Sequence, residues 1–301
     1  MKVNILLPIG LMLLLGCQAQ KESSLDVKAY QQEVDAWHRN RVENDLKGPT
    51  GWLNLAGLFW LNEGFNTFGS GEENDLVFPE GKIAANAGTF SLQQGLVTLT
   101  AQKDSEIMHE DSIVTSMVVH YPDSSFYPMM IHGSLQWFVI ERNGAVGVRL
   151  RDLESEAVAN FEGVDRYPID PHWRVEADFE WAEGNRTIDV TNILGQTYAQ
   201  ASPGTLVFAI DGKTYRLDVL DEGGEEYFVI FGDKTNELET YPSGRYMYIS
   251  KPDNNGMVIV DFNKSYNPPC AFSSFATCPV PPKQNVLGLS IRAGEKNFSD
   301  H

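Results

Sequence analysis

Asp261 and Asn263 are an acid and an amide placed where a strand is expected to end. The run alternates one set of side chains, Met257, Ile259, Asp261 and Asn263, with a second set, Val258, Val260 and Phe262. Because successive side chains of a strand point to opposite faces, we expect a central strand, apolar on both faces, that turns polar on one face at its end. Such an end predicts the floor of a concave site at a barrel mouth, where Asp261 could act as a general base. In the alternative interpretation both side chains bind the backbone of the following loop, and the sequence leaves the two open.

Arg149 and Arg151 share one face of another expected strand. Val146, Val148 and Leu150 lie on the other face, and Ala145 and Gly147 leave space beside the arginines. A pair of guanidinium groups suits carboxylate or phosphate, so one hypothesis is a shelf that recognises an anion. A solvated strand face is the simpler interpretation and the one that we expect.

Cys270 and Cys278 are separated by seven residues in a proline-rich segment. In an oxidising compartment this pattern favours a structural disulfide that closes the loop. The alternatives are a thiolate nucleophile or metal ligand at Cys270, or two inert thiols.

No local motif indicates a metal or a cofactor. The histidines before the last residue form neither HxH nor HExxH, and they are His38, His109, His120, His132 and His172. GxSxG, Walker and GxGxxG motifs are also absent from the sequence. We therefore expect no metal site and no bound cofactor, although catalysis by groups from scattered strands stays open.

Composition excludes several classes of protein. The chain has 301 residues, of which 42% are hydrophobic and 21% charged, as in ordinary globular proteins. Its 41 acidic residues against 23 Lys and Arg give a formal charge of −18, which repels nucleic acids. No apolar run reaches the roughly 18 residues of a spanning helix, so a multispan transporter is excluded.

The first residues read as an export signal. Lys2 precedes an apolar run from Val3 to Leu15, and Leu14-Leu15-Gly16-Cys17 resembles the bacterial lipobox. This resemblance implies cleavage after residue 16, acylation of Cys17 with palmitate-type chains, and a membrane anchor in the bacterial cell envelope. Residues 17–24 would form a polar tether; the target membrane, inner or outer, is not specified. A plain signal peptide is the alternative.

The remaining elements are one helix and many strands. Helical spacing of Tyr30, Val34 and Trp37 predicts an amphipathic helix over 27–46, after a capping-box spacing of Ser23 and Asp26. Beyond residue 48, alternation and turn dipeptides such as Asp211-Gly212 predict roughly fourteen short strands. We expect a mainly β fold: a small sandwich over 48–152, a connection over 153–168, and an antiparallel barrel or curled sheet over 169–301. One continuous sheet is the alternative.

Two family resemblances add to these expectations. The segments Gly57-Leu-Phe-Trp-Leu61, Phe68-Gly69-Ser70 and Asn74-Asp75-Leu76-Val77 resemble the opening strands of a forkhead-associated sandwich. In that family an arginine follows the glycine and grips phosphothreonine. Here Ser70 takes that place, so the resemblance implies a similar fold without phosphopeptide binding.

The C-terminal part is similar to a bacterial family catalogued as domain of unknown function 1684. The resemblance is carried by Asn267-Pro-Pro-Cys270, Thr277-Cys278-Pro279 and Gly244-Arg245, together with Gly51-Trp52-Leu53 and Arg149-Leu150-Arg151-Asp152, and so covers nearly all of the mature chain. It implies that Arg245, Asp261, Asn263, Tyr266 and Asn267 are hallmark residues, and it supplies no reaction.

Three functions follow from these observations. The favoured one is an envelope lipoprotein whose C-terminal β domain binds a small polar or anionic ligand. Its ligand site would comprise Tyr241, Arg245, Asp261, Asn263, Tyr266 and Asn267. The second is a hydrolase in which Asp261 acts as general base and Arg245 stabilises negative charge, with Cys270 a further catalytic candidate. The third is a structural or assembly lipoprotein without a ligand site.

Overall fold

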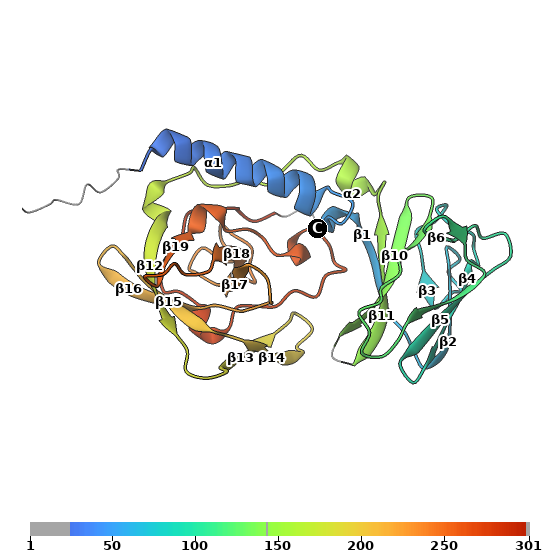
Figure 1. The fold of residues 1–301 in the computed structure, drawn as a ribbon. Coiled ribbons are helices and arrows are strands. Elements are labelled where there is room, and N and C mark those ends of the chain that lie inside the picture. Colours follow the sequence, from blue (N-terminus) through green and yellow to red (C-terminus); the bar gives the residue numbers. More distant parts are fainter. Residues whose placement is uncertain (1–24, 143, 299–301) are drawn as a thin grey trace, which may run out of the picture.

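The computed structural model describes residues 25–142 and 144–298. The expected signal peptide, the lipid attachment site Cys17 and the tether lie outside these residues. The fold is mainly β: one long N-terminal helix accompanies several sheets (Figure 1). Short helical segments occur at α2 (Glu156–Ala159), Trp52–Asn54, Pro171–Trp173, Phe262–Lys264, Pro269–Ala271 and Lys283–Asn285.

Helix α1 (Val27–Asn40) continues as a π-helical segment, Arg41–Leu46. The predicted range is thus helical throughout, but its end widens to π-helix. Asp26 itself is the N-cap, because its carboxylate accepts hydrogen bonds from the N–H groups of Lys28 and Ala29 at 3.1 Å. Tyr30 and Val34 are buried, as the apolar spacing predicts. No helix within the described ranges is long and apolar enough to cross a bilayer.

Two sheets pack face to face in the first β part. One has six strands in the order β1 (Leu55–Trp60), β11 (Ala145–Asp152), β10 (Leu135–Arg142), β9 (Met130–His132), β6 (Met108–His109) and β7 (Ser112–Ile113). The other has five, in the order β3 (Leu76–Val77), β2 (Gly64–Gly69), β4 (Gly88–Gln93), β5 (Leu96–Ala101) and β8 (Ser116–His120). Side chains of both, including Phe68, Phe90 and Trp137, share one core.

The strands after residue 170 form separate open sheets. Four of them pair in the order β16 (Lys213–Asp218), β15 (Gly204–Ile210), β12 (Arg174–Trp181) and β19 (Met257–Asp261). Two ribbons stand beside them, β13 (Thr187–Thr191) with β14 (Thr197–Ala201), and β17 (Glu226–Phe231) with β18 (Arg245–Ser250). The expected barrel or curled sheet is wrong, because in the described chain β16 and β19 remain unjoined edges of the four-stranded sheet.

Strand β19 is therefore an edge strand, not the central strand that its apolar composition suggests. It pairs with β12 alone within the described sheets. Val258, Val260 and Phe262 are buried in the core between this sheet and the β17–β18 ribbon, whereas Ile259 is 37% exposed. One face of the strand therefore borders solvent. Because Ile259 on that face is apolar, the strand has the same sequence pattern as a strand that is covered on both faces.

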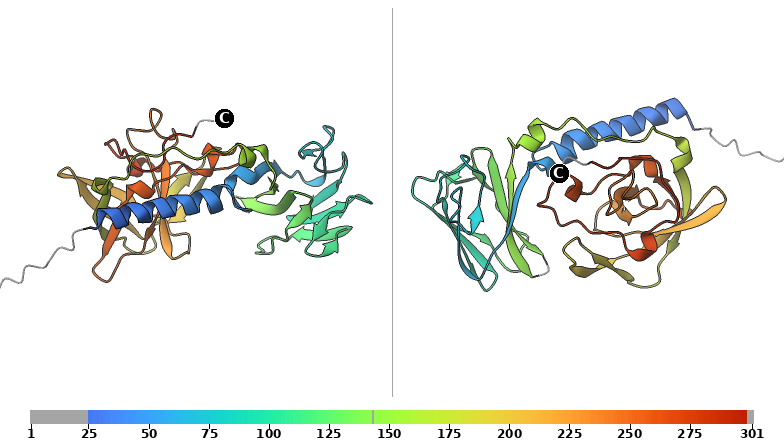
Figure 2. Two further views of the ribbon diagram at one scale, coloured as in Figure 1. Left: turned by 90° about the horizontal axis from the view of Figure 1, so that it is seen from above. Right: turned by 180° about the vertical axis from the view of Figure 1, so that it is seen from behind.

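The two β parts lie side by side, and α1 runs along one side of the C-terminal part toward their junction (Figures 1 and 2). Strand β11 of the six-stranded sheet faces the C-terminal part (Figure 1). Leu55 on β1 joins a core with Phe228, Tyr246 and Cys278 from beyond residue 190. The outer face of the six-stranded sheet is thus partly covered, which matters for Arg149 and Arg151.

Candidate functional site

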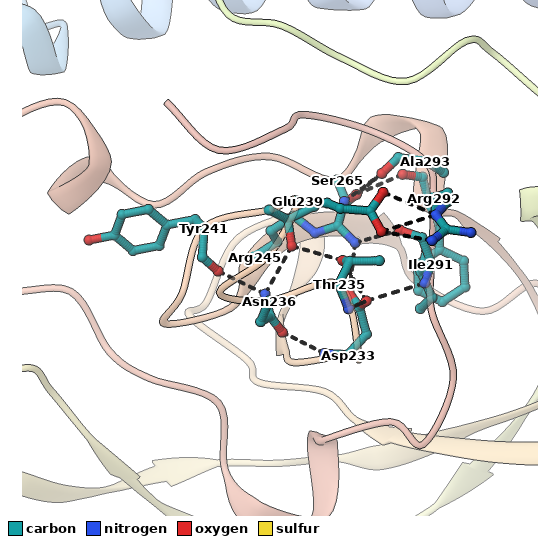
Figure 3. A network of polar contacts seen from close by, with 12 residues as sticks. Asp233, Thr235, Asn236, Glu239, Tyr241, Arg245, Ser265, Ile291, Arg292 and Ala293 are labelled. Atoms are coloured by element: carbon teal, nitrogen blue, oxygen red, sulfur yellow. Dashed lines mark hydrogen bonds and ion pairs between the residues drawn. The ribbon is translucent and has the colours of Figure 1, made fainter. Parts of the chain in front are cut away.

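Arg245 is wholly buried inside the C-terminal part and ties its last segment in place. Its guanidinium pairs with the Asp233 carboxylate at 2.7 Å, and both side chains are fully buried. It also donates to the carbonyls of Ile291, at 2.9 Å, and Ala293. Figure 3 shows this network, with the ring of Tyr241 pointing away from Arg245. These contacts hold loops together and leave the charge of Arg245 without access to a ligand.

The side chains of Asp261 and Asn263 form most of their hydrogen bonds with other parts of the chain. Asn263 Oδ1 accepts from the N–H of Asp170 at 3.1 Å, and Asn263 Nδ2 donates to the Asp170 carbonyl at 2.9 Å. The Asp261 Oδ1 atom accepts from the Tyr30 hydroxyl at 2.8 Å and from the Asn263 N–H at 3.1 Å. Asp261 also borders a cavity of about 600 Å³ beneath α1. Its main contacts therefore dock the helix.

Asn267 and Tyr266 differ in what they can reach. Asn267 is fully buried and donates from its backbone N–H to Glu295 Oε2 and from Nδ2 to the Lys296 carbonyl, both at 2.7 Å. Tyr266 stacks under the Arg41 guanidinium, 4.2 Å from its ring centroid, and borders two cavities. Of the expected ligand residues, only Tyr266 lines the cavity between the six-stranded sheet and the C-terminal part.

Cys270 and Cys278 are placed as a disulfide pair with Cα atoms 6.1 Å apart. The backbone N–H of each donates to the sulfur of the other, at 3.0 and 3.2 Å. The pair closes the Pro-rich loop. One end of this loop borders a cavity between the six-stranded sheet and the C-terminal part.

A cavity of about 650 Å³ lies between the six-stranded sheet and the C-terminal part. We call it the arginine cavity, after the three arginines on its sheet side, Arg142, Arg149 and Arg151. Aromatic side chains form much of the opposite wall, and they are Tyr198, Phe228, Tyr246, Tyr248 and Tyr266. A few hundred cubic ångströms is the size of a small-molecule site.

Strand register brings the three arginines to one face. Arg149 and Arg151 are two residues apart on β11, and Arg142 at the end of β10 pairs with Ala145. Directly paired residues of antiparallel strands point to the same side, so Arg142 lies on the face of Ala145, Gly147, Arg149 and Arg151. Val146, Val148 and Leu150 point the other way, into the sandwich core.

These guanidinium groups have few partners. Arg142 donates to the Thr277 hydroxyl, and Arg151 donates to the Gly51 carbonyl at 3.5 Å. Arg149 Nη2 and Arg151 Nε are buried without a hydrogen-bond partner in the described part of the chain. Within residues 25–142 and 144–298, Arg149 has neither an ion pair nor a side-chain hydrogen bond. The face is thus not the solvated one that we expected from the sequence.

The pKa values of Arg149 and Arg151 are both lowered by burial. The pKa of Arg149 falls to about 10, and the like charges of Arg142 and Arg151 contribute in the same direction. Arg149 remains a cation at neutral pH, and an anion bound beside it would offset the repulsion from its neighbours.

The aromatic wall is neutral and anchored. Tyr246 donates to the Pro279 carbonyl at 2.6 Å, and Tyr248 donates to Glu222 Oε2 at 3.0 Å. Burial raises the pKa of both tyrosines, so both hydroxyls stay protonated at neutral pH. In the described parts of the chain, no group of three or more His, Cys, Asp or Glu could hold a metal ion.

Sequence reasoning missed Arg142, Glu222, Tyr198 and Tyr248. A signal for Arg142 was present: the Asn143-Gly144 dipeptide marks a two-residue hairpin turn, which pairs residue 142 with 145 and puts Arg142 on the face of Arg149. The tyrosines carried no such signal, because they reach the cavity from two separate ribbons.

Fold and site together define a mainly β protein with an arginine-lined cavity between its two β parts. Residues 159–296 match the model of the family described as "Protein of unknown function (DUF1684)". This match is narrower than the resemblance implied, since it omits Gly51-Trp52-Leu53 and Arg149-Leu150-Arg151-Asp152. The family domain thus supplies the aromatic wall, and the preceding sheet supplies the arginines.

One solved structure similar to the chain is the solution NMR structure of an uncharacterized protein from Haloarcula marismortui. It is 30% identical, covers 48% of this chain and 80% of its own, and has a TM-score of 0.40. No curated protein matches the chain.

Proposed function

We propose that the protein is a lipoprotein of the bacterial cell envelope that binds a small anionic ligand in the arginine cavity. One observation carries the ligand proposal. In a chain with 41 acidic residues and 23 Lys and Arg, three arginines line one cavity without an ion pair to any described carboxylate. Arg149 and Arg151 are half-buried, and each has a buried guanidinium nitrogen without a partner among the described residues, which favours carboxylate or phosphate as the missing partner.

Isothermal titration of the full mature chain in detergent with inorganic phosphate and with succinate tests the ligand proposal. We expect at least one of the two to bind, and Arg149→Met to weaken that binding by about tenfold or more, as loss of a charge-assisted hydrogen bond would. The matched control is Arg216→Met, which removes an exposed arginine paired with Glu180 on β12. Equal affinity of the wild type and Arg149→Met would refute the proposal.

The lipid anchor rests on the Leu14-Leu15-Gly16-Cys17 pattern. Mass spectrometry of the N-terminal peptide from protein made in a bacterial host tests it. Acyl chains on Cys17 are expected, and a free Cys17 thiol on the mature protein would contradict the anchor.

The forkhead-associated likeness of residues 48–152 stays a proposal about fold. Two sheets around one core support it. Ser70, which stands where that family has its arginine, donates its hydroxyl to the Ile83 carbonyl at 2.8 Å. That contact serves the loop, so phosphopeptide binding is not proposed.

A further inference from the structure

The arginine cavity also has an acidic side. Glu222 lines it from the loop between β16 and β17. Its Oε2 atom accepts a hydrogen bond from Tyr248 at 3.0 Å, and no cation of the described chain lies within ion-pair distance of its carboxylate. Tyr248 thereby orients an exposed carboxylate that has no counter-charge among the described residues.

The two kinds of charge act on the same region. Burial raises the pKa of Tyr198, Glu222 raises it further and Arg142 lowers it, so Glu222 and Arg142 both lie within electrostatic reach of this ring. Glu141 also lines the cavity, but its carboxylate is 3.3 Å from His120 Nε2. Glu222 is consequently the available acid. Opposite charges that share a cavity without pairing are complementary to a ligand that carries both signs.

We propose that the ligand is a zwitterion whose anionic group binds at Arg149 and Arg151 and whose ammonium group binds at Glu222. This inference rests on the proposed function and names the class of its ligand. The rings of Tyr198 and Tyr248 add to the site, because aromatic faces attract ammonium groups. A carboxylate or a phosphate satisfies the arginines equally, so both anions are included in the test.

Matched ligand pairs isolate the ammonium group. Ethyl phosphate and phosphoethanolamine differ only in that group, as do propionate and β-alanine. Isothermal titration of the full mature chain in detergent should show the ammonium member of at least one pair binding about tenfold more tightly than its partner. Glu222→Gln should abolish this preference, so that the two members of the pair bind with equal affinity. The amide oxygen of the substituted side chain can still accept from Tyr248, so the tyrosine keeps its partner. The control Glu183→Gln, in the exposed turn after β12, should keep the preference.

Tyr248→Phe serves as a second variant. It leaves the charge of Glu222 but removes the hydroxyl that positions it, so the ammonium preference should fall without vanishing. If anions bind and the ammonium group adds nothing, the zwitterion is refuted. If the ammonium advantage survives Glu222→Gln, the ammonium site at Glu222 is refuted. Anion binding stands in both cases. If no member of either pair binds the wild type, the proposed function fails as well.

Discussion

Arg149 carries a guanidinium that is half-buried and has no partner among the residues that the structure describes. Removing a charged group from water costs free energy unless an opposite charge or hydrogen bonds compensate. Its neighbours add to that cost, because Arg142 and Arg151 repel it and lower its pKa in the same direction as burial. A residue that destabilises the empty protein and borders a cavity fits a binding role better than a structural one.

Arg149→Met is therefore expected to stabilise the protein without ligand, by about 1 kcal/mol in the free energy of unfolding. Urea denaturation followed by tryptophan fluorescence measures this change. The pKa of Arg149 is about 10 in the fold, below its ordinary 12.5, so the wild type loses its penalty progressively as pH rises from 10 toward 12.5. The advantage of the Met variant should then shrink. A destabilised Met variant would show that Arg149 supports the fold.

Asp261 shows how far single residues could be predicted. Its position at a strand end, and the polar surroundings of that end, followed from alternation. Its partner did not, because Tyr30 lies 231 residues away in the sequence. Likewise, nothing near Arg245 in the sequence reveals that Asp233 and three carbonyl groups enclose it. Long-range contacts decide whether an acid or a base faces a ligand or the chain.

At the scale of elements, α1 is fastened to the C-terminal part mainly through buried polar contacts. Arg41, the first π-helical residue, is 2% exposed and pairs with Glu295, 1% exposed, at 2.6 Å. Its guanidinium also lies 4.9 Å from the ring centroid of Trp52. Arg166 and Lys264 add ion pairs to Asp35 and Glu33 on the helix. The helix thus depends on one buried pair assisted by more exposed ones.

Arg41→Met should cost about 3–5 kcal/mol of unfolding free energy, because it leaves Glu295 buried without its cation. Lys264→Met, which breaks the more exposed pair to Glu33, should cost less than about 1 kcal/mol. Chemical denaturation of both variants checks the contrast. Adding Glu295→Gln to Arg41→Met should recover part of the loss. A loss for Arg41→Met as small as that for Lys264→Met would mean that the buried pair does not secure the helix.

Helix and strands were predictable where periodicity is local. The 27–46 helix and the Asp211-Gly212 turn between β15 and β16 both follow from spacing and turn chemistry. Closure of a sheet does not, because it depends on whether edges distant in sequence meet. The apolar side chain of Ile259 suggested a covered strand, but β19 is an edge.

At the scale of the whole molecule, the site arises from the packing of two β parts. The sheet contributes positive charge and the DUF1684 domain contributes tyrosines and Glu222. Periodicity placed Arg149 and Arg151 on one face of a strand, and hairpin register would have added Arg142. Neither pattern could show that another part of the chain covers this face. A solvated face was therefore the expectation from the sequence.

The most direct measurement is a crystal structure of the protein grown with selenate, whose selenium is located by anomalous scattering. We expect selenium in the arginine cavity, with selenate oxygens about 3 Å from the guanidinium groups of Arg149 and Arg151. A cavity holding only water, at a selenate concentration that saturates binding in solution, would contradict it.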